Sequence, residues 1–302
     1  MSRGRRWRWG LAAAVGAALS CGSGAAEEVV VHADLPYYDG PGADAKKHLL
    51  DLYLPAEAQN FPVLFFVHGG GWRHGYKDGW FNPFPRLGNG LARHGVGVVV
   101  TTYRLAPKHK FPAQAEDVAR AVRWTYEHID EYGGDPGRIF LSGHSAGAHL
   151  AALVALDSRY LEAEGVPPEV VAGVAGLSGP YDITFMKEDA GWFLRWYGIT
   201  PTFGEEAEAL EAASAPRYAS AAAPPFLLLY AEGDIPHLAA QAYRLSTALT
   251  RLGVRAPVYK IEGQNHYTII YYAGQEGEET TALILDFITE HGTRFADRSI
   301  PE

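Results

Sequence analysis

The chain has 302 residues, of which 47% are hydrophobic and 20% are charged, and its formal net charge is −9. This length and composition are typical of one large globular domain with a well-buried core, which excludes a disordered or fibrous chain. The acidic balance disfavours nucleic acid as a partner, because phosphate binding requires a basic surface.

The first 26 residues differ from the rest of the chain. Four arginines precede an apolar stretch at residues 10–19, and small residues follow as far as Ala26. This order is typical of a secretory signal peptide, and the apolar stretch is too short for a transmembrane span. We therefore expect residues 1–26 to be removed on export to the periplasm or the extracellular space.

Cys21, the only cysteine, lies inside this segment. Its surroundings are a loose version of the lipid-attachment site of bacterial lipoproteins, so a lipid anchor at Cys21 is a second, open interpretation. If cleavage follows Ala26, the mature chain has no cysteine for a disulfide, a thiol nucleophile or a metal site.

Beyond residue 26, short apolar runs alternate with longer amphipathic segments. The runs predict strands at residues 29–31, 49–54, 61–67, 96–102, 139–142, 170–177, 226–230 and 257–261. Helical spacing predicts helices at residues 114–132, 146–156, 238–252 and 280–288, and Gly253 follows the third helix, where a left-handed residue is favoured. This alternation predicts an α/β domain at residues 27–302, with a mostly parallel central sheet flanked by helices.

Residues 180–216 interrupt the alternation after the sixth predicted strand. They are rich first in aromatic and then in acidic side chains. We interpret this segment as a small insertion packed over the carboxyl edge of the sheet.

The strongest chemical signal is Gly143-His144-Ser145-Ala146-Gly147, between a predicted strand and a predicted helix. A serine flanked by glycines can adopt the strained backbone of a sharp strand-to-helix turn, which lifts its hydroxyl clear of the sheet. The helix N-terminus there favours developing negative charge. The motif predicts that Ser145 is a nucleophile, the alternative being a glycine-rich turn with a buried serine.

A second motif, His-Gly-Gly-Gly-Trp at residues 68–72, directly follows another apolar strand. Its glycines leave backbone N–H groups unshielded, so that they can point at an oxyanion. We expect the N–H groups of Gly69, Gly70 and Ala146 to form an oxyanion hole. His68 is interpreted as a structural hydrogen-bonding group, and the alternative for the motif is a flexible loop.

Two polar residues follow later strands at the same predicted edge of the sheet. Asp234 comes just after the strand at residues 226–230, and His266 comes just after the strand at 257–261. A serine needs a base to remove its proton, and hydrolases of this type place an acid and then a histidine after it in the chain. We predict His266 as the base and Asp234 as the acid. The rivals weighed against them are Glu232 and Asp182 as acids and His144, His149 and His237 as histidines.

Aromatic and imidazole side chains near these motifs are candidates for the substrate pocket, namely Trp72, His144 and Tyr181. No cofactor is expected, and no metal, because the chain has no His-Glu-x-x-His motif.

At this point the residues resemble a known group of proteins. The motifs that carry the resemblance are His68–Trp72, Tyr103–Pro107, Phe111–Gln114, Asp117 with Trp124, Gly133–Pro136 and Gly143–Gly147 with His149-Leu150. They resemble α/β-hydrolases of the hormone-sensitive-lipase-like carboxylesterase, feruloyl-esterase-like and kynurenine-formamidase-like groups. The resemblance covers roughly residues 48–290. It implies an α/β-hydrolase fold with Ser145, Asp234 and His266 as a triad.

Two segments of the chain resemble different branches of that group. Residues 103–107 are more like the carboxylesterase branch, whereas residues 177–182 are similar to a segment of the formamidase branch. The expected partner is a small-molecule ester with a small or aromatic acyl group. Hydrolysis of an arylformamide and a non-catalytic binding module on the same scaffold are the alternatives.

Overall fold

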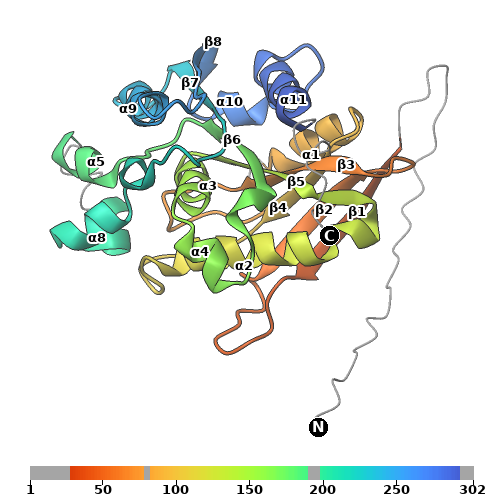
Figure 1. Cartoon of the computed structure of the whole chain (residues 1–302), viewed down its shortest axis with the longest axis horizontal. Coiled ribbons are helices and arrows are strands. Elements are labelled where there is room, and N and C mark those ends of the chain that lie inside the picture. The colour runs from red at the N-terminus through yellow and green to blue at the C-terminus, as the bar shows by residue number, and fades with distance from the viewer. Residues whose placement is uncertain (1–27, 78–81, 190–197, 293–302) are drawn as a thin grey trace.

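The computed structural model describes residues 28–77, 82–189 and 198–292, so the predicted signal peptide and Cys21 lie outside the described residues. Within them, one eight-stranded sheet has the order β1-β2-β4-β3-β5-β6-β7-β8 (Figure 1). The strands are β1 (Val29–Pro36), β2 (Leu49–Pro55), β3 (Phe61–Val67), β4 (Gly97–Thr101), β5 (Gly134–His144), β6 (Val171–Leu177), β7 (Phe226–Gly233) and β8 (Val258–Asn265).

The sheet is mostly parallel, as predicted. β2 pairs antiparallel with both β1 and β4, while every pairing from β4 through β3 to β8 is parallel. Every residue of β4 and β6 is buried, whereas the edge strands β1 and β8 contain many exposed residues. The continuous apolar runs in the sequence therefore correspond to central strands, which helices cover on both faces of the sheet.

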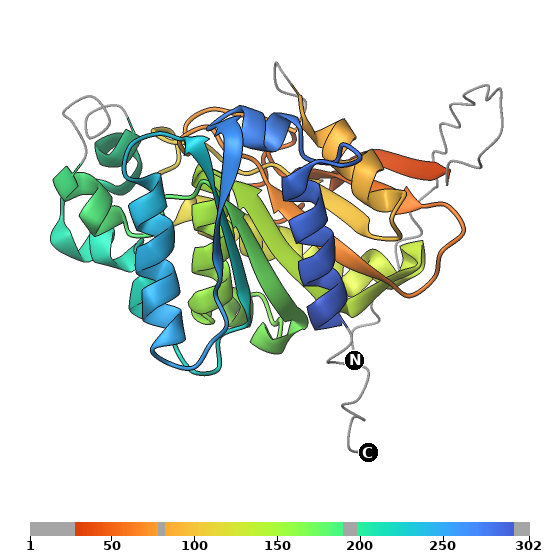
Figure 2. The ribbon, with the colours of Figure 1, turned by 90° about the horizontal axis from the view of Figure 1, so that it is seen from above.

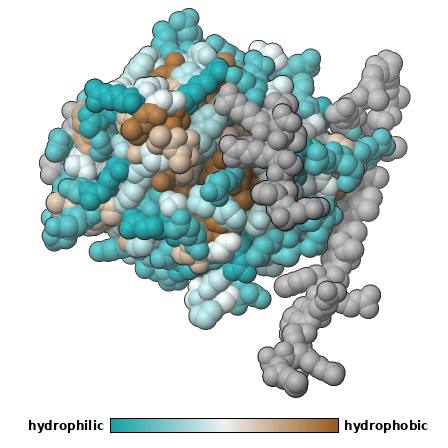
Figure 3. Space-filling model, in the orientation of Figure 1, coloured by the Kyte–Doolittle hydropathy of each residue, from teal (hydrophilic) through white to brown (hydrophobic). Residues whose placement is uncertain are grey.

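Helices cover the two faces of the sheet (Figures 1 and 2). The helices are α1 (Phe84–Ala92), α2 (Ala113–His128), α3 (Ala146–Leu156), α4 (Arg159–Ala163), α5 (Ile183–Asp189), α7 (Thr200–Phe203), α8 (Ala207–Ala212), α9 (Leu238–Thr250), α10 (Thr268–Tyr271) and α11 (Glu279–Gly292). One core cluster joins α2, α3 and α9 to the sheet, and a second joins α1, α10 and α11. Hydrophilic residues cover most of the face in Figure 3, and hydrophobic residues show in a few small areas.

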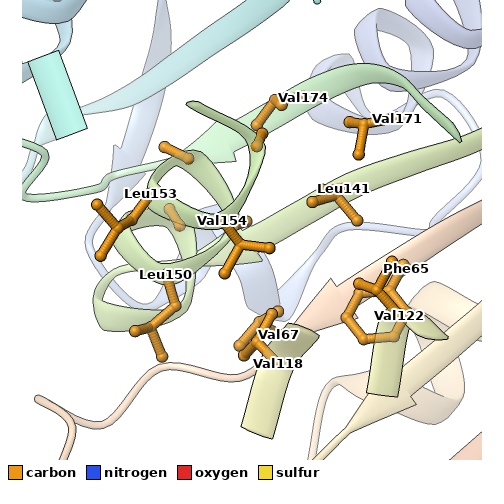
Figure 4. Packing of buried hydrophobic residues seen from close by; sticks show 14 of the residues in the cluster. Phe65, Val67, Val118, Val122, Leu141, Leu150, Leu153, Val154, Val171 and Val174 are labelled. Atoms are coloured by element: carbon orange, nitrogen blue, oxygen red, sulfur yellow. The ribbon is translucent and has the colours of Figure 1, made fainter. Parts of the chain in front are cut away.

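The helix that follows Ser145 is the most deeply buried of these. Every residue of α3 is buried. Leu150 and Val154 pack in one cluster with Val67 and Leu141 of the sheet and with Val118 of α2 (Figure 4). Alanines between these larger residues are buried in the same cluster, and their small side chains let α3 pack close to the sheet. This packing holds the turn at the N-terminus of α3 in place.

The structure differs from the predicted elements in ways that have local causes. The helix predicted to reach residue 132 becomes 3₁₀ over Ile129–Tyr132 and ends where Gly133 has φ 86°. Gly253 has φ 81°, which confirms the left-handed residue predicted after α9. α1 is not among the predicted helices, because the glycines in its sequence disfavour a helix. A Cβ at Gly88 would lie 2.3 Å from the Tyr53 ring, so packing favours glycine there.

The described part of the insertion packs beside the sheet more than over its edge. Figures 1 and 2 place α5 and α8 together at one end of the molecule, near α9. The 3₁₀ turn Ala215–Tyr218 packs against both α3 and α9. Phe203, at the end of α7, reaches the glycine loop, where its ring centroid lies 4.8 Å from that of Trp72.

A buried carboxylate joins α2 to the loop that follows β4. Asp117 is fully buried, and its oxygens accept hydrogen bonds from the Arg104 backbone N–H at 2.9 Å and from the Arg104 guanidinium at 2.7 Å. Arg120 and His48 also contact it, at 3.0 and 3.2 Å. Burial alone raises the pKa of Asp117, but hydrogen bonds from His48 and Arg104 outweigh it and hold the pKa below its usual value.

Replacement of this carboxylate tests how far the fold depends on it. Asp117→Asn should lower the free energy of unfolding by about 3 kcal/mol, because it leaves buried donors without a charged acceptor. Urea unfolding at pH 7 measures the loss. Glu127→Gln on the same helix, which breaks the exposed pair with Arg123 at 3.0 Å, is the matched control and should cost only a small fraction of that.

The pH dependence gives a second check on the same pair of variants. A carboxyl group whose folded-state pKa is depressed stabilises the fold above its unfolded pKa of about 3.9 and loses that contribution as the pH falls. The stability difference between the wild type and Asp117→Asn should therefore shrink below about pH 4. Equal losses for Asp117→Asn and Glu127→Gln at pH 7 would contradict the structural role of Asp117.

Candidate active site

Ser145 stands at a sharp turn between β5 and α3. Its backbone has φ 55° and ψ −122°, a conformation that side-chain-bearing residues rarely adopt. The Ser145 N–H donates to the carbonyl of Leu177 on the neighbouring strand β6 at 2.9 Å. The turn thus has the strained geometry predicted from the motif.

The glycines on either side make room for this turn. A Cβ at Gly143 would lie 2.4 Å from the carbonyl carbon of Gly147. A Cβ at Gly147 would lie 2.0 Å from the carbonyl oxygen of Val67, at the end of β3. Both approaches are too close for any side chain, so the two glycines are required by packing as well as by the turn.

Ser145, His266 and Asp234 form one continuous chain of hydrogen bonds. The Ser145 Oγ lies 3.0 Å from His266 Nε2, and His266 Nδ1 lies 2.7 Å from Asp234 Oδ1. The three residues follow β5, β8 and β7, and these strands end at one edge of the parallel sheet. In this order the imidazole can take the proton of the serine hydroxyl, and the carboxylate can orient the imidazole. This is the arrangement of an activated serine nucleophile.

The Asp234 carboxylate is fixed by four donors. His266 and the Ile235 N–H contact Oδ1, while the Ser178 hydroxyl at 2.6 Å and the Ala231 N–H at 3.1 Å contact Oδ2. Burial raises the pKa of Asp234, but the hydrogen bonds from His266 and Ser178 outweigh burial and lower it. The carboxylate therefore stays ionised and keeps its orientation toward His266.

His144, predicted to line the pocket, lies between the serine turn and the histidine loop. Its Nε2 donates to the His266 carbonyl oxygen at 2.7 Å, and the centroids of the two rings are 4.6 Å apart. Burial and the nearby His266 lower the pKa of His144 to about 3, so its ring is neutral. Only 7% of His144 is exposed, so it supports the His266 backbone more than it faces an open pocket.

The glycine loop lies against the serine turn. A Cβ at Gly69 would lie 3.3 Å from the Ser145 Cβ and 2.9 Å from the His144 carbonyl oxygen. Among the described residues, the N–H groups of Gly69 and Gly70 donate to no protein acceptor. Ala146 begins α3, where backbone N–H groups have no intrahelical acceptor. These three N–H groups therefore have no acceptor among the described residues, and Gly69 lies against the Ser145 side chain.

His68 and Tyr103 pack against each other and support the glycine loop. Their rings stack at 4.4 Å with 15° between planes, and the Tyr103 hydroxyl donates to the His68 carbonyl at 3.1 Å. Burial lowers the pKa of His68 to about 4. His68 is a neutral structural residue in this arrangement, as interpreted from the sequence.

The other two predicted pocket residues lie in the hydrophobic core. Trp72 is 2% exposed and Tyr181 is not exposed at all. The Trp72 ring contacts the rings of His149 and Phe203, and a Cβ at Gly176 would lie 2.2 Å from the Tyr181 hydroxyl oxygen. The prediction that they form a pocket wall is not supported by these positions, because both rings are enclosed by protein.

The rival acids and histidines take part in other contacts. Glu232 accepts from the Gly263 N–H at 3.0 Å. Asp182 binds Arg244 and caps the start of α5 through the Phe185 N–H. His237 precedes α9 as its N-cap residue, with φ 76°, and His149 lies inside α3.

Ser178 belongs to the site, but the sequence analysis gave it no role. It follows β6 directly, with φ 53°, and is 1% exposed. The available signal was its position, since a polar residue at the end of the strand between β5 and β7 must lie near Ser145 and Asp234.

The described residues also bear on metal binding and on membrane insertion. They contain no group of three or more histidine, cysteine, aspartate or glutamate side chains placed to hold a metal ion. No helix in the same residues is sufficiently long and apolar to span a bilayer.

Comparison with known proteins agrees with this geometry. Esterase LipQ of Mycobacterium tuberculosis is 32% identical over 84% of this chain and 61% of its own length. The isoprenylcysteine α-carbonyl methylesterase ICME of Arabidopsis thaliana is 30% identical over 74% of this chain and 54% of its own. The chain therefore spans about half to three fifths of the length of these curated relatives.

A solved esterase structure from Pyrobaculum calidifontis superposes with a TM-score of 0.67 at 28% identity, over 80% of this chain and 81% of that one. The family model BD-FAE matches residues 50–249, which include Ser145 and Asp234 and more than half of the chain. Together with the eight-stranded sheet and the strained serine turn, these matches place the chain in the BD-FAE family, within the hormone-sensitive-lipase-like group of α/β-hydrolases.

Proposed function

We propose that this chain is an exported serine hydrolase that cleaves carboxylic esters through an acyl-enzyme. The observation that carries the proposal is the hydrogen-bonded chain from Ser145 through His266 to Asp234, with Gly69 of the glycine loop against Ser145 and Ala146 at the start of α3. The esterase relatives support the same chemistry.

The proposed reaction has two similar halves. His266 Nε2 takes the hydroxyl proton while Ser145 Oγ attacks the ester carbonyl carbon, and the carbonyl electron pair moves to its oxygen. The three N–H groups stabilise that oxyanion. The intermediate then collapses, the carbon–oxygen bond to the alcohol breaks, and the leaving oxygen takes the proton from His266. Water repeats the sequence on the acyl-enzyme and releases the acid.

The proposal extends to the acyl group of the ester. Trp72 and Tyr181, two of the aromatic side chains expected to shape the pocket, are buried in the core. We therefore favour small acyl groups, with aromatic acyl esters and arylformamides as alternatives. Ser178, in the formamidase-like segment, contacts Asp234, which would serve either reaction.

Loss of the nucleophile tests the reaction. Ser145→Ala should lower kcat by a factor of about a thousand or more, because the residual rate comes only from substrate binding and the oxyanion donors. Turnover of p-nitrophenyl acetate, butyrate and octanoate, methyl ferulate and N-formylkynurenine measures the loss and compares the alternatives. Ser246→Ala, which alters a serine on α9 outside the site, is the control and should keep wild-type rates. Ser145-independent turnover would contradict the proposal.

Two acids close in sequence test the identity of the acid. Asp234→Asn should lower kcat by about 10⁴, because an amide no longer holds the histidine tautomer or stabilises the imidazolium. Glu232 lies two residues before Asp234 and its side chain is exposed. Glu232→Gln should therefore leave kcat within about twofold of the wild type. A larger loss for Glu232→Gln than for Asp234→Asn would assign the acid to the rival residue.

Export depends on residues 1–26, and the mass of the mature protein tests it. After expression of the whole chain in a bacterial host, we expect periplasmic or secreted protein that begins at Glu27. Intact-mass measurement distinguishes this from a chain that begins at a lipid-modified Cys21, for which Cys21→Ala is the matched control. A cytoplasmic chain that retains residues 1–26 would contradict export.

A further inference from the structure

His149 is a fully buried histidine that the proposed reaction does not use. Both ring nitrogens are engaged, since the Trp72 indole N–H donates to Nδ1 at 3.1 Å and Nε2 lies 2.7 Å from the Ala213 carbonyl oxygen. An indole nitrogen only donates and a carbonyl only accepts, so the ring is neutral with its proton on Nε2. Burial lowers the pKa of His149 to about 4, which agrees with a neutral ring.

These two hydrogen bonds, named here the His149 link, join three segments that are distant in sequence. Trp72 lies two residues after Gly70 of the proposed oxyanion hole. His149 lies one turn into α3, and its backbone N–H donates to the Ser145 carbonyl at 3.2 Å. Ala213 caps the C-terminus of α8 in the insertion. The link therefore runs from the insertion, through the helix that carries the serine turn, to the glycine loop.

The glycine loop needs such support because its backbone is strained at the same point. Trp72 has φ 60°, a left-handed conformation that costs a residue with a side chain free energy. Packing contributes to holding it there, since the Phe203 ring lies 4.8 Å from that of Trp72 and 5.8 Å from that of His149. The indole N–H is the directional contact that fixes the rotation of Trp72 relative to α3.

We propose that His149 is a positioning residue that keeps the N–H groups of the glycine loop aligned with Ser145 through the His149 link. This inference rests on the proposed function, because the alignment matters when negative charge develops on the substrate oxygen. Donors aimed at an oxyanion stabilise the transition state more than the ground state, so misalignment lowers kcat and changes KM little. A histidine that only stabilises the fold would not separate the two constants.

The test uses the whole chain with His149→Phe, Trp72→Phe and the double variant. Each removes one or both hydrogen bonds and keeps an aromatic ring in the core. We expect kcat for the best ester to fall about ten- to a hundredfold in each single variant, with KM within about threefold of the wild type. The double variant should fall no more than about threefold below the worse single variant, because the two residues act as one unit.

Two further variants separate positioning from stability. His149→Gln carries an acceptor and a donor on one carbon, as the imidazole does, and should recover part of the kcat that His149→Phe loses. Thr125→Val removes a buried hydrogen bond of 2.9 Å in α2, outside the site, and is the matched control. It should lower Tm like the link variants and keep kcat.

Labelling with a fluorophosphonate distinguishes failure of this inference from failure of the proposed function. That reagent reacts at an activated Ser145 and develops charge at the same donors, so no correct ester is needed. We expect the labelling rate of His149→Phe to fall in proportion to kcat. If esters are not turned over, the proposed function is wrong and the labelling rates still decide the inference. Folded His149→Phe and Trp72→Phe that keep wild-type labelling and kcat, or lose no more than Thr125→Val, would overturn it.

Discussion

The close contact between the start of α3 and the end of β3 is the constraint on which the rest of the site depends. Gly147 approaches the Val67 carbonyl so closely that a Cβ there would lie 2.0 Å from its oxygen. That approach holds Ser145 in its strained conformation, and it also places the loop after β3 beside the serine. One packing contact therefore sets both the nucleophile and the donors that would face its substrate.

The strand order brings three further residues to the turn at Ser145. β5, β6, β7 and β8 are successive neighbours in the sheet, and each is followed at its carboxyl end by one member of the site. These members are Ser145, Ser178, Asp234 and His266. Because parallel strands end at a common edge, residues up to 121 positions apart in sequence meet within hydrogen-bond distance.

Three buried histidines form a neutral framework at the serine turn and the glycine loop. Burial lowers the pKa values of His68, His144 and His149, so these rings serve as hydrogen-bonding groups without charge. His144 binds the His266 backbone, whereas His149 binds Trp72 and the insertion. An uncharged framework places polar groups near the triad without adding a second positive charge beside Asp234.

The sequence by itself determined the fold class, the strained turn at Ser145 and the candidate pair Asp234 and His266. Each depends on local rules, namely the period of apolar residues, the need for glycine at close backbone contacts, and polar residues at strand ends. Only the tertiary structure decided that Trp72 and Tyr181 are buried, that Ser178 contacts Asp234, and that α1 is a helix despite its glycines. Those features depend on which segments pack together, and residue type and spacing do not specify that packing.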